Sequence, residues 1–354
     1  MNLFIELLQI AIGQRTGFSI RPSISDWQAL WKEAQKQTIV GTIMCGLERL
    51  SEELRPPKEL LLMWYGATLQ IERRNILLNV RCTELERMFV NNGFNCCILK
   101  GQGNALLYPN PLRRQCGDID IWVKGGIGEI IVFLETKCDM SHQVKGYHHT
   151  EFPIWEDVEV EVHWRPSWLS SPRHNHRLQQ WFIEHSTETC EKTGMIVPTW
   201  EFNVVYQLQH MFLHVLQEGL GLRQVMDYYY LLRSEDREKD VSFEDTLKWL
   251  GLYGFAGAMM YVMKEVFLLD ERLMIAPVNE KKGRFLLEEI LQSGNFGRRD
   301  ERNVKLHKTT GINRRLSRAK RRLRFLKEYP IEVLCTPFQI YHVIWRKLRL
   351  WRFE

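Results

Sequence analysis

The sequence predicts an α+β protein in which a small mixed sheet lies between two helical regions. Three observations support this prediction. Apolar residues recur at helical spacing up to residue 93, two short segments with strand-like patterns follow, and helical spacing returns after Pro166. We therefore divide the chain into an N-terminal helical region (1–93), a sheet-containing core (94–166), a C-terminal helical domain (167–294) and a basic linker and tail (295–354).

Length and composition indicate a globular chain. The 354 residues are enough for two or three compact units, and 45% hydrophobic with 26% charged residues allow a sizeable core. The sequence contains no uncharged apolar run of the ~18 residues that a membrane span needs, and we recognise no secretory leader at its start. Its eight cysteines form no CxxC pair, so we expect free thiols in a reducing cytoplasm and no zinc site.

In the N-terminal region, apolar residues follow helical spacing over residues 26–50 and again over 61–90. Pro56 and Pro57 separate these segments, because proline disrupts the hydrogen bonding of a helix interior. Gly93 is suited to the left-handed conformation that often ends a helix. The sequence thus predicts two helical segments with a break at the two prolines.

The core begins with residues 95–99 (NCCIL), a short apolar run typical of a buried strand. A turn at Gly101 and a short helix at 104–108 are expected to follow. Residues 118–123 (DIDIWV) and 158–164 (VEVEVHW) alternate between polar and apolar, as half-buried strands do. A helix over residues 127–137 is expected between these two strands.

Beyond Pro166, helical spacing predicts two packed helices at 201–219 and 222–233, and further helices at 243–268 and 281–293. Residues 295–313 are rich in glycine and charge, which is typical of a linker. From residue 301 to the end, 15 Lys and Arg stand against 4 Glu. The end of the chain is therefore strongly basic, and a basic helix is expected to begin at Arg314.

The acids of the predicted strand 118–123 indicate a metal site. Asp118 and Asp120 are two residues apart, so their carboxylates project from the same face of the strand. Adjacent carboxylates repel each other unless a cation lies between them, and Mg²⁺ is commonly held by one or two carboxylates together with substrate phosphates. A third carboxylate from the other alternating strand, Glu159 or Glu161, would complete a site for two metal ions.

The turn at Lys100 and Gly101 suits the phosphate groups of a nucleotide. Gly101 allows close approach of the backbone to a phosphate, and a helix that starts there directs free N–H groups at an anion. Lys100 or Arg114 would supply positive charge. These groups, with metal ions and a carboxylate beside an acceptor hydroxyl, are what phosphoryl-type transfer requires. Each motif alone is weak evidence, and their order along the chain is more specific.

That order resembles the nucleotidyltransferase superfamily with the DNA polymerase beta fold. The motifs are LKGQGNALLYP from Leu99, GDIDIWV from Gly117 and EVHWRP from Glu161. More narrowly, the chain is similar to a bacterial family of nucleotidyltransferase-like proteins, which flank this core with helices. The resemblance covers roughly residues 27–270, including ERRNILL at 72–78 and HMFLHVLQEGLGLRQVMDYYYLL at 210–232.

The resemblance implies that Asp118 and Asp120 bind the metal ions, with Glu161 as third carboxylate and base. The implied cofactor is Mg²⁺ or Mn²⁺. The expected nucleotide-binding residues are Lys100, Gly101, Arg114 and Gly117. The chain departs from the superfamily pattern in two places. Lys100-Gly101 replaces the usual Gly-Gly or Gly-Ser turn, so the phosphate contacts are expected to differ, and the third acid is Glu rather than the more usual Asp.

Glu159 and a pair of histidines are weaker candidates for the site. Glu159 shares a strand face with Glu161. His210 and His214 are four residues apart and share a helix face. For these histidines a packed helix face is the favoured interpretation, a polar pair at the nucleotide cleft comes next, and half of a zinc site is the least favoured.

Arg223 and Asp227 are also four residues apart on one helix. An ordinary ion pair between them is the simple interpretation. The alternative is that Arg223 binds phosphate and Asp227 orients it. His163 follows Glu161 in the predicted strand, and we expect its side chain to point to the opposite face and to have a structural role.

The leading functional hypothesis is an enzyme that transfers a nucleoside monophosphate from an NTP to an unidentified hydroxyl acceptor. A non-catalytic module of the same fold, which binds a nucleotide or a partner, is the main alternative. Transfer of the terminal phosphate is a third hypothesis.

The basic segment 314–354 has three interpretations: a helix that packs against the body, an anchor on an anionic membrane surface, or a contact to nucleic acid. The expected location is the cytoplasm, with peripheral attachment at the inner membrane face if the tail binds lipid.

Overall fold

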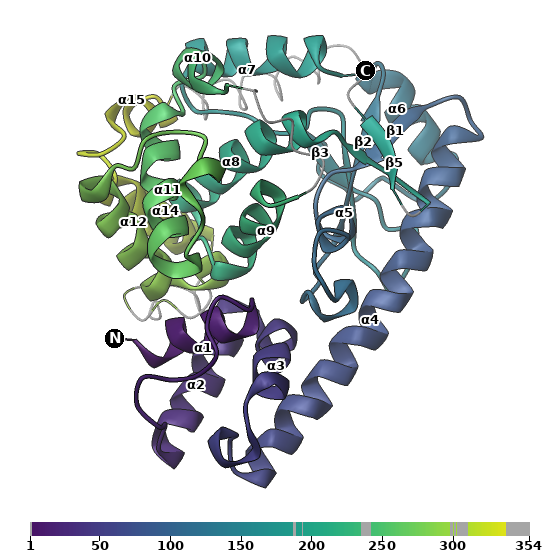
Figure 1. The fold of residues 1–354 in the computed structure, drawn as a ribbon. Helices are drawn as coiled ribbons and strands as arrows, with labels where there is room; N and C mark the ends of the chain where they lie inside the picture. Colours follow the sequence, from purple (N-terminus) through teal and green to yellow (C-terminus); the bar gives the residue numbers. More distant parts are fainter. Residues whose placement is uncertain are drawn as a thin grey trace.

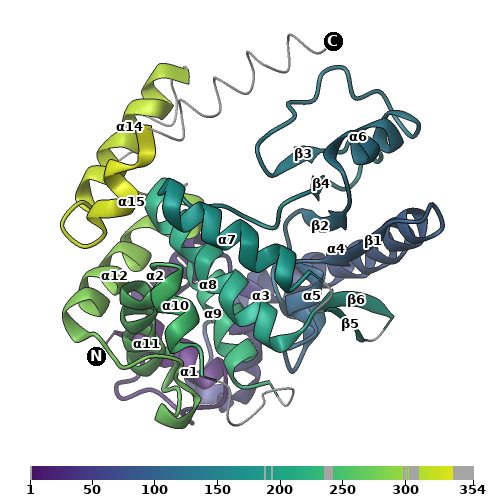
Figure 2. The same cartoon turned by 90° about the horizontal axis from the view of Figure 1, so that it is seen from above.

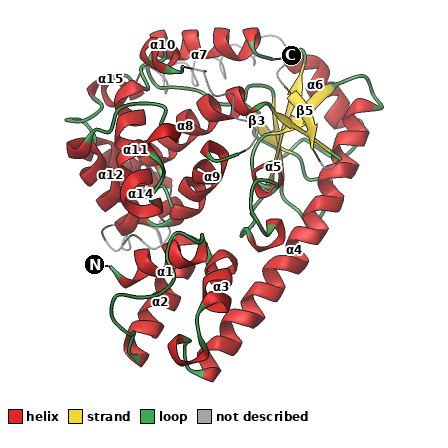
Figure 3. Ribbon diagram, in the orientation of Figure 1, coloured by secondary structure: helices red, strands yellow, loops and turns green. Residues whose placement is uncertain are grey.

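The computed structural model describes residues 2–186, 189–192, 194–234, 242–297, 300, 302 and 311–337. These residues form an α+β fold, as predicted, with a small mixed sheet to which helices pack on several sides (Figure 1). Figure 3 shows the strands gathered in one part of a mainly helical molecule. The division of the chain at residues 93, 166 and 294 stays a prediction.

The N-terminal region is helical, as expected. Its helices are α1 (Leu3–Ala11), α2 (Ile24–Gln37), α3 (Val40–Arg49) and α4 (Lys58–Val90). The first predicted segment is divided in two, because Thr38 adopts a left-handed conformation with φ of 59° between α2 and α3. The 33-residue α4 starts directly after Pro57 and runs from the N-terminal helices to the sheet (Figure 1). Gly93 follows α4 with φ of 83°, as its sequence position predicts.

The sheet has the order β1-β2-β4-β3. Its strands are β1 (Asn95–Ile98), β2 (Ile119–Lys124), β3 (His149–Glu151) and β4 (Val160–His163). β2 and β4 are parallel, whereas β1 and β3 are antiparallel to their neighbours. Helix α6 (Ile127–Glu135) lies in the connection from β2 to β3. The strand β3 was not predicted, because three residues are too few to show an alternating pattern.

The two faces of the sheet differ in polarity. Ile119, Ile121 and Val123 of β2 are buried in an apolar cluster that includes Leu78, Leu85 and Phe89 of α4. Asp120 projects from the opposite face. The alternation separates an apolar face from a more polar one, but β2 is buried on both faces rather than half-buried as predicted, because Trp122 on the Asp120 face stacks on Phe202.

Several short elements around the sheet differ from the predictions. The expected helix at 104–108 is found as α5 (Gln102–Ala105), directly after Gly101. Besides β3, three further elements were not predicted: α7 (Pro172–Glu184), β5 (Thr189–Lys192) and β6 (Met195–Pro198). β5 and β6 form a separate antiparallel pair.

Most of the remaining helices pack together with the N-terminal helices in a second apolar cluster. The remaining helices are α8 (Trp200–Gln217), α9 (Leu222–Leu232), α10 (Glu244–Trp249), α11 (Tyr253–Phe267), α12 (Glu280–Ser293), α14 (Gly311–Arg324) and α15 (Pro330–Leu334). The predicted helix 243–268 is interrupted at Gly251, whose φ is 74°. Figure 2 shows α14 and α15 close together near α12. Of the helices described, none is long and apolar enough to cross a membrane.

A close backbone contact joins the N-terminal helices to the core. Gly41 of α3 lies against the main chain of Arg113, and a Cβ at this position would clash with the Arg113 carbonyl oxygen. Gly41→Ala is therefore expected to lower the free energy of unfolding by about 1–3 kcal/mol, as overpacking does. Chemical denaturation measures the change.

Gly66→Ala is the matched control, because Gly66 lies within α4 and a Cβ there would meet no atom within 4 Å. It should stabilise the protein by up to about 1 kcal/mol, since alanine favours helix. Equal effects of the two substitutions would show that the contact with Arg113 is not tight.

Candidate functional site

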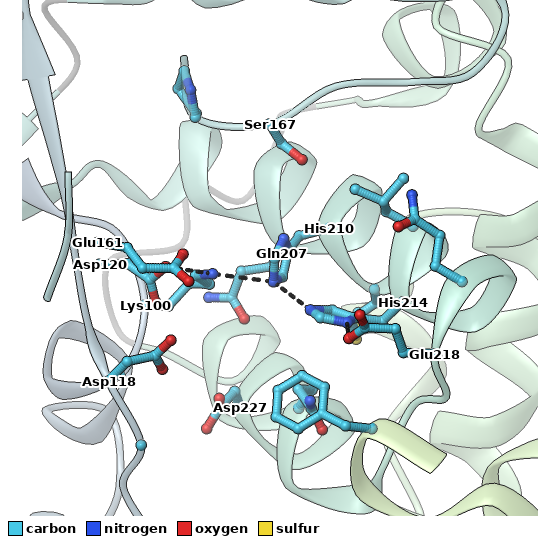
Figure 4. Close-up of a pocket in the computed structure, with 18 of the residues that line it drawn as sticks. Lys100, Asp118, Asp120, Glu161, Ser167, Gln207, His210, His214, Glu218 and Asp227 are labelled. Atoms are coloured by element: carbon cyan, nitrogen blue, oxygen red, sulfur yellow. Dashed lines mark hydrogen bonds and ion pairs between the residues drawn. The ribbon is translucent and has the colours of Figure 1, made fainter. Parts of the chain in front are cut away.

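A pocket of about 650 Å³ lies between the polar face of the sheet and helices α8 and α9. Figure 4 shows Asp118, Asp120 and Glu161 on one side of this pocket, facing His210, His214 and Glu218 on the other. The pocket thus brings together residues that are far apart in the sequence.

The three predicted carboxylates meet at this pocket. Asp118 directly precedes β2 and Asp120 lies within it, while Glu161 lies on the parallel neighbour β4. In the strand register Asp120 is the partner of Glu161, so both side chains leave the sheet on the same face. Of the two candidates for the third acid, Glu161 lines the pocket, whereas Glu159 is exposed outside it.

The electrostatic environment shifts the pKa values of Asp118 and Asp120 in opposite directions. Repulsion from Asp120, with burial, raises the pKa of Asp118 to about 6. Although burial alone would raise it, Lys100 and His163 hold the pKa of Asp120 well below its usual range. Asp120 is therefore firmly ionised, and Asp118 carries a negative charge that a cation would stabilise.

Lys100 contacts both sides of the pocket. Its Nζ lies 2.8 Å from Asp120 Oδ1 and 3.2 Å from His210 Nε2. Gly101, which follows it, has a positive φ of 51° and leads into α5. A Cβ at Gly101 would lie 3.3 Å from the Asp118 carbonyl oxygen, so this turn also packs closely against the start of β2. Gly117 lines the pocket next to Asp118.

Arg114 lines the pocket but is held by a buried carboxylate. Its Nε and Nη2 each donate a hydrogen bond of 2.7 Å to Asp227. Asp227 also accepts a 2.7 Å hydrogen bond from the Tyr108 hydroxyl. Asp227 therefore pairs with Arg114, and the simple prediction of an Arg223–Asp227 ion pair is wrong.

Arg223 differs from the other basic side chains of this pocket in its surroundings. Four other basic side chains line the pocket, and each has a carboxylate within 4 Å: Lys100, Arg114, Arg318 and Arg321. Arg223 has no such partner in the part of the chain that the structure describes. It donates to the carbonyl oxygen of Gln115 at 3.2 Å and lies over the ring of Phe296, while its buried Nε has no hydrogen-bond partner. Such a cation favours an anionic ligand.

His163 is also part of the site, so the expectation that it faces away from Glu161 is wrong. Residues 161 and 163 are two apart on β4 and project from the same face. His163 Nε2 lies 2.9 Å from Asp120 Oδ1 and 3.3 Å from Glu161 Oε2. Burial would lower its pKa, but its hydrogen bonds to Asp120 and Glu161 raise it.

His210 and His214 face the pocket from α8, which agrees with their interpretation as a polar pair at the cleft. Their Nε2 atoms lie 2.8 Å apart. Burial lowers the pKa of both, to about 3 for His214, because a charged imidazole loses hydration and Lys100 is close. Both rings are therefore neutral at neutral pH.

Sequence analysis missed other residues that line the pocket. His149 is the first residue of β3 and His148 precedes it. Both line the pocket, as do Trp168 and Glu218. Arg318 and Arg321 come from α14, so part of the predicted basic tail forms a pocket wall. Arg318 pairs with Glu218 at 2.6 Å. Residues 338–354 lie outside the described part of the chain.

The residues present fit a divalent cation. Ligand atoms of Asp120, Glu161 and His163 lie within 4.8 Å of one another, and the pKa of Asp118 is raised mainly by an excess of negative charge. Carboxylate oxygens are preferred by Mg²⁺ and Mn²⁺. Asp120, Glu161 and His163 are the residues whose ligand atoms lie close enough to hold such an ion, and Asp118 lines the pocket beside them.

An α+β fold with carboxylates on adjacent strands, beside basic residues in one pocket, is suited to binding metal and phosphate. Residues 23–268 match the model of the family described as "Uncharacterised nucleotidyltransferase". This match covers more than half of the chain, and the chain belongs to that family. The matched segment contains the whole four-stranded sheet and the carboxylates described above.

A search of solved structures found a similarity to an antigenic nucleotidyltransferase-like protein from Paracoccidioides brasiliensis. The two share 12% sequence identity, with a TM-score of 0.36, over 58% of this chain and 96% of the other. No curated protein matches the chain.

Proposed function

We propose that the protein is a metal-dependent nucleotidyltransferase of the DNA polymerase beta type, which moves a nucleoside monophosphate from an NTP to a hydroxyl acceptor. The observation that carries this proposal is the meeting of Asp118, Asp120 and Glu161 from two parallel strands at a pocket with basic side chains. Membership of the nucleotidyltransferase family supports it.

In this proposal Asp118, Asp120 and Glu161 hold Mg²⁺ or Mn²⁺. A bound ion of this kind would neutralise charge on the phosphate oxygens and orient them. The ion pair between Lys100 and Asp120 then becomes unnecessary, and Lys100 is available to a phosphate oxygen. Lys100 and Gly101 lie in the turn that precedes α5, next to the acids.

Arg223 is the proposed main anchor of the triphosphate. It is buried, lines the pocket and has no carboxylate partner among the described residues, so a phosphate group would supply the missing charge. Gly117 leaves space beside it, since a Cβ there would lie 3.6 Å from Arg223 Nη1. Arg114 is proposed to act with Asp227 as a support for this wall, because its guanidinium is already bound.

The proposed reaction joins the acceptor oxygen to the α-phosphorus. The bond from that phosphorus to the oxygen shared with the β-phosphorus breaks, and pyrophosphate leaves with the electron pair. Glu161 takes the proton of the acceptor hydroxyl. Its carboxylate remains ionised because, against the effect of burial, a hydrogen bond from His163 lowers its pKa.

The first test is calorimetric titration of the four NTPs, with Mg²⁺ or Mn²⁺, into the wild type and two matched variants. Glu161→Gln is expected to weaken metal-dependent binding about tenfold to a hundredfold, because it removes a ligand charge. Glu159→Gln changes an exposed acid two residues away and should leave binding unchanged. If both variants bind as the wild type does, Glu161 is not a metal ligand.

Product analysis separates the alternatives. Release of pyrophosphate supports nucleotidyl transfer, whereas nucleoside diphosphate would indicate transfer of the terminal phosphate. Metal-dependent NTP binding without turnover over many acceptors would favour a non-catalytic binding module. A role of residues 314–354 on an anionic membrane surface or a nucleic acid, and a cytoplasmic location, stay predictions. Arg318 and Arg321 of α14 also line the pocket.

A further inference from the structure

Three imidazoles form a cluster at the edge of the pocket, beside the carboxylates. His149 begins β3 and is the register partner of His163 at the end of β4. His148 precedes His149, and its carbonyl oxygen accepts hydrogen bonds from the backbone N–H groups of Trp164 and Arg165. The pairing of two strands therefore fixes the positions of all three histidines.

The ring nitrogens of this cluster are close enough to share one ion. One ligand atom from each of His148, His149 and His163 lies within 4.8 Å of the others. His149 Nδ1 and His148 Nε2 are 2.7 Å apart, so the two rings share a proton. A metal ion can take the place of that proton when the rings separate slightly.

One ring nitrogen of this cluster is left unsatisfied. The side chain of His163 is only 3% exposed, and its Nδ1 is buried without a hydrogen-bond partner among the described residues. A buried polar atom of this kind is costly unless something binds it. The same ring already uses Nε2 to contact Asp120 and Glu161.

The chemistry of these donors differs from that of the acidic site. Imidazole nitrogens suit Zn²⁺ and similar transition metals, whereas carboxylates suit Mg²⁺ and Mn²⁺. Three protein ligands with one position left open are typical of zinc ions in active sites. Glu161 Oε2 lies 3.8 Å from His149 Nε2, at the border between the two sites.

We propose that His148, His149 and His163 bind one transition-metal ion of the Zn²⁺ class, at a site next to the acidic one, with His163 lying between the two. The absence of a cysteine framework does not weaken this proposal, because the ligands are imidazoles on paired strands. The site does not depend on nucleotidyl transfer, and its occupancy is measured without any nucleotide.

Visible spectroscopy with Co²⁺ tests the proposal, since Co²⁺ replaces Zn²⁺ and its absorption reports nitrogen ligands. The full chain is titrated with Co²⁺, and bound Zn²⁺ is counted by elemental analysis. With Mg²⁺ in excess to occupy the acidic site, the wild type is expected to bind one Co²⁺ or Zn²⁺ ion. His148→Ala/His149→Ala should weaken binding at least about a hundredfold, because ligands are lost directly. His142→Ala/His176→Ala removes two exposed histidines elsewhere and should bind as the wild type does.

The variant Asp118→Asn shows which of the two sites gives the Co²⁺ spectrum. Asp118 is not a member of the imidazole cluster, so this variant should keep its Co²⁺ spectrum even if it loses NTP binding. The milder His149→Gln should also weaken Co²⁺ binding while near-UV circular dichroism shows an unchanged fold. The proposal is overturned if the wild type binds Co²⁺ and Zn²⁺ no more tightly than the folded His149→Gln variant, or if Asp118→Asn alone abolishes the spectrum.

Discussion

Asp118→Asn is expected to lower the rate of metal-dependent nucleotidyl transfer about a thousandfold while making the folded protein more stable. The loss follows from the proposed role of Asp118 in holding the cation, which contributes several kcal/mol to transition-state stabilisation. The gain follows from the repulsion between Asp118 and Asp120, which asparagine removes.

The pH dependence of the stability effect has a defined sign. The pKa of Asp118 is about 6 in the folded protein and near 3.8 without the fold, so the folded state binds this proton more tightly. Ionisation of Asp118 therefore destabilises the wild type as the pH rises from about 4 to 6. Without divalent cations, Asp118→Asn should be more stable on the order of 2 kcal/mol at pH 7 and should lose this advantage near pH 4.

Turnover assays and urea denaturation at both pH values measure these two effects. Asp245→Asn, in the exposed first turn of α10, is the control and should change neither by much. A variant that lost both activity and stability at pH 7 would show that Asp118 supports the fold rather than a bound cation.

Asp227→Ala is expected to lower the free energy of unfolding by about 3–5 kcal/mol, because it leaves the buried guanidinium of Arg114 without a counter-ion. Arg114 and Asp227 are 4% and 3% exposed, so water cannot replace the lost partner. Arg223 makes the loss more severe, since its positive charge is close to Arg114. This loss is a large fraction of the about 5–15 kcal/mol that is usual for the free energy of unfolding of a folded protein.

Urea denaturation of three variants distinguishes this effect from a general cost of substitution. Arg284→Ala removes one half of an exposed ion pair with Glu280 and should cost no more than about 1 kcal/mol. The double variant Arg114→Met/Asp227→Leu should recover much of the loss, because neither charge remains. Equal losses in Asp227→Ala and Arg284→Ala would contradict a buried, closely paired site.

The parts of the site that sequence predicted are those with a local pattern. Alternation alone indicates that Asp118 and Asp120 share a face while Ile119 and Ile121 enter the core. A positive φ at Gly93 follows from a glycine at the end of a helix. These features depend on residues only a few positions apart, and the structure has them where they were expected.

Pairings between distant residues were beyond local patterns. Arg114 and Asp227 are 113 residues apart, and the helical spacing of Asp227 suggested Arg223 as its partner instead. Arg318 reaches the pocket from the basic segment, for which packing against the body was one of three interpretations, and no local pattern indicated that it lines this pocket. In both cases tertiary packing, rather than neighbouring sequence, selects the contact.

The positions of His148, His149 and His163 were not predicted correctly, for two different reasons. His148 and His149 depend on β3, which is too short to have a recognisable period. His163 was misplaced although the spacing from Glu161 was available, since two residues along a strand always return to the same face. Applied consistently, that rule would have found His163 at the acids.

Helix α4 belongs to both apolar clusters of the molecule. Trp64, near its start, packs in one cluster with Trp31 alongside, and Phe89, near its end, packs beneath the sheet in the other. A helix of 33 residues is a single hydrogen-bonded unit about 50 Å long, so neither cluster can lose it alone. We therefore expect the two clusters to be thermodynamically coupled, because melting of the N-terminal helices would withdraw support from the strands that carry the acids.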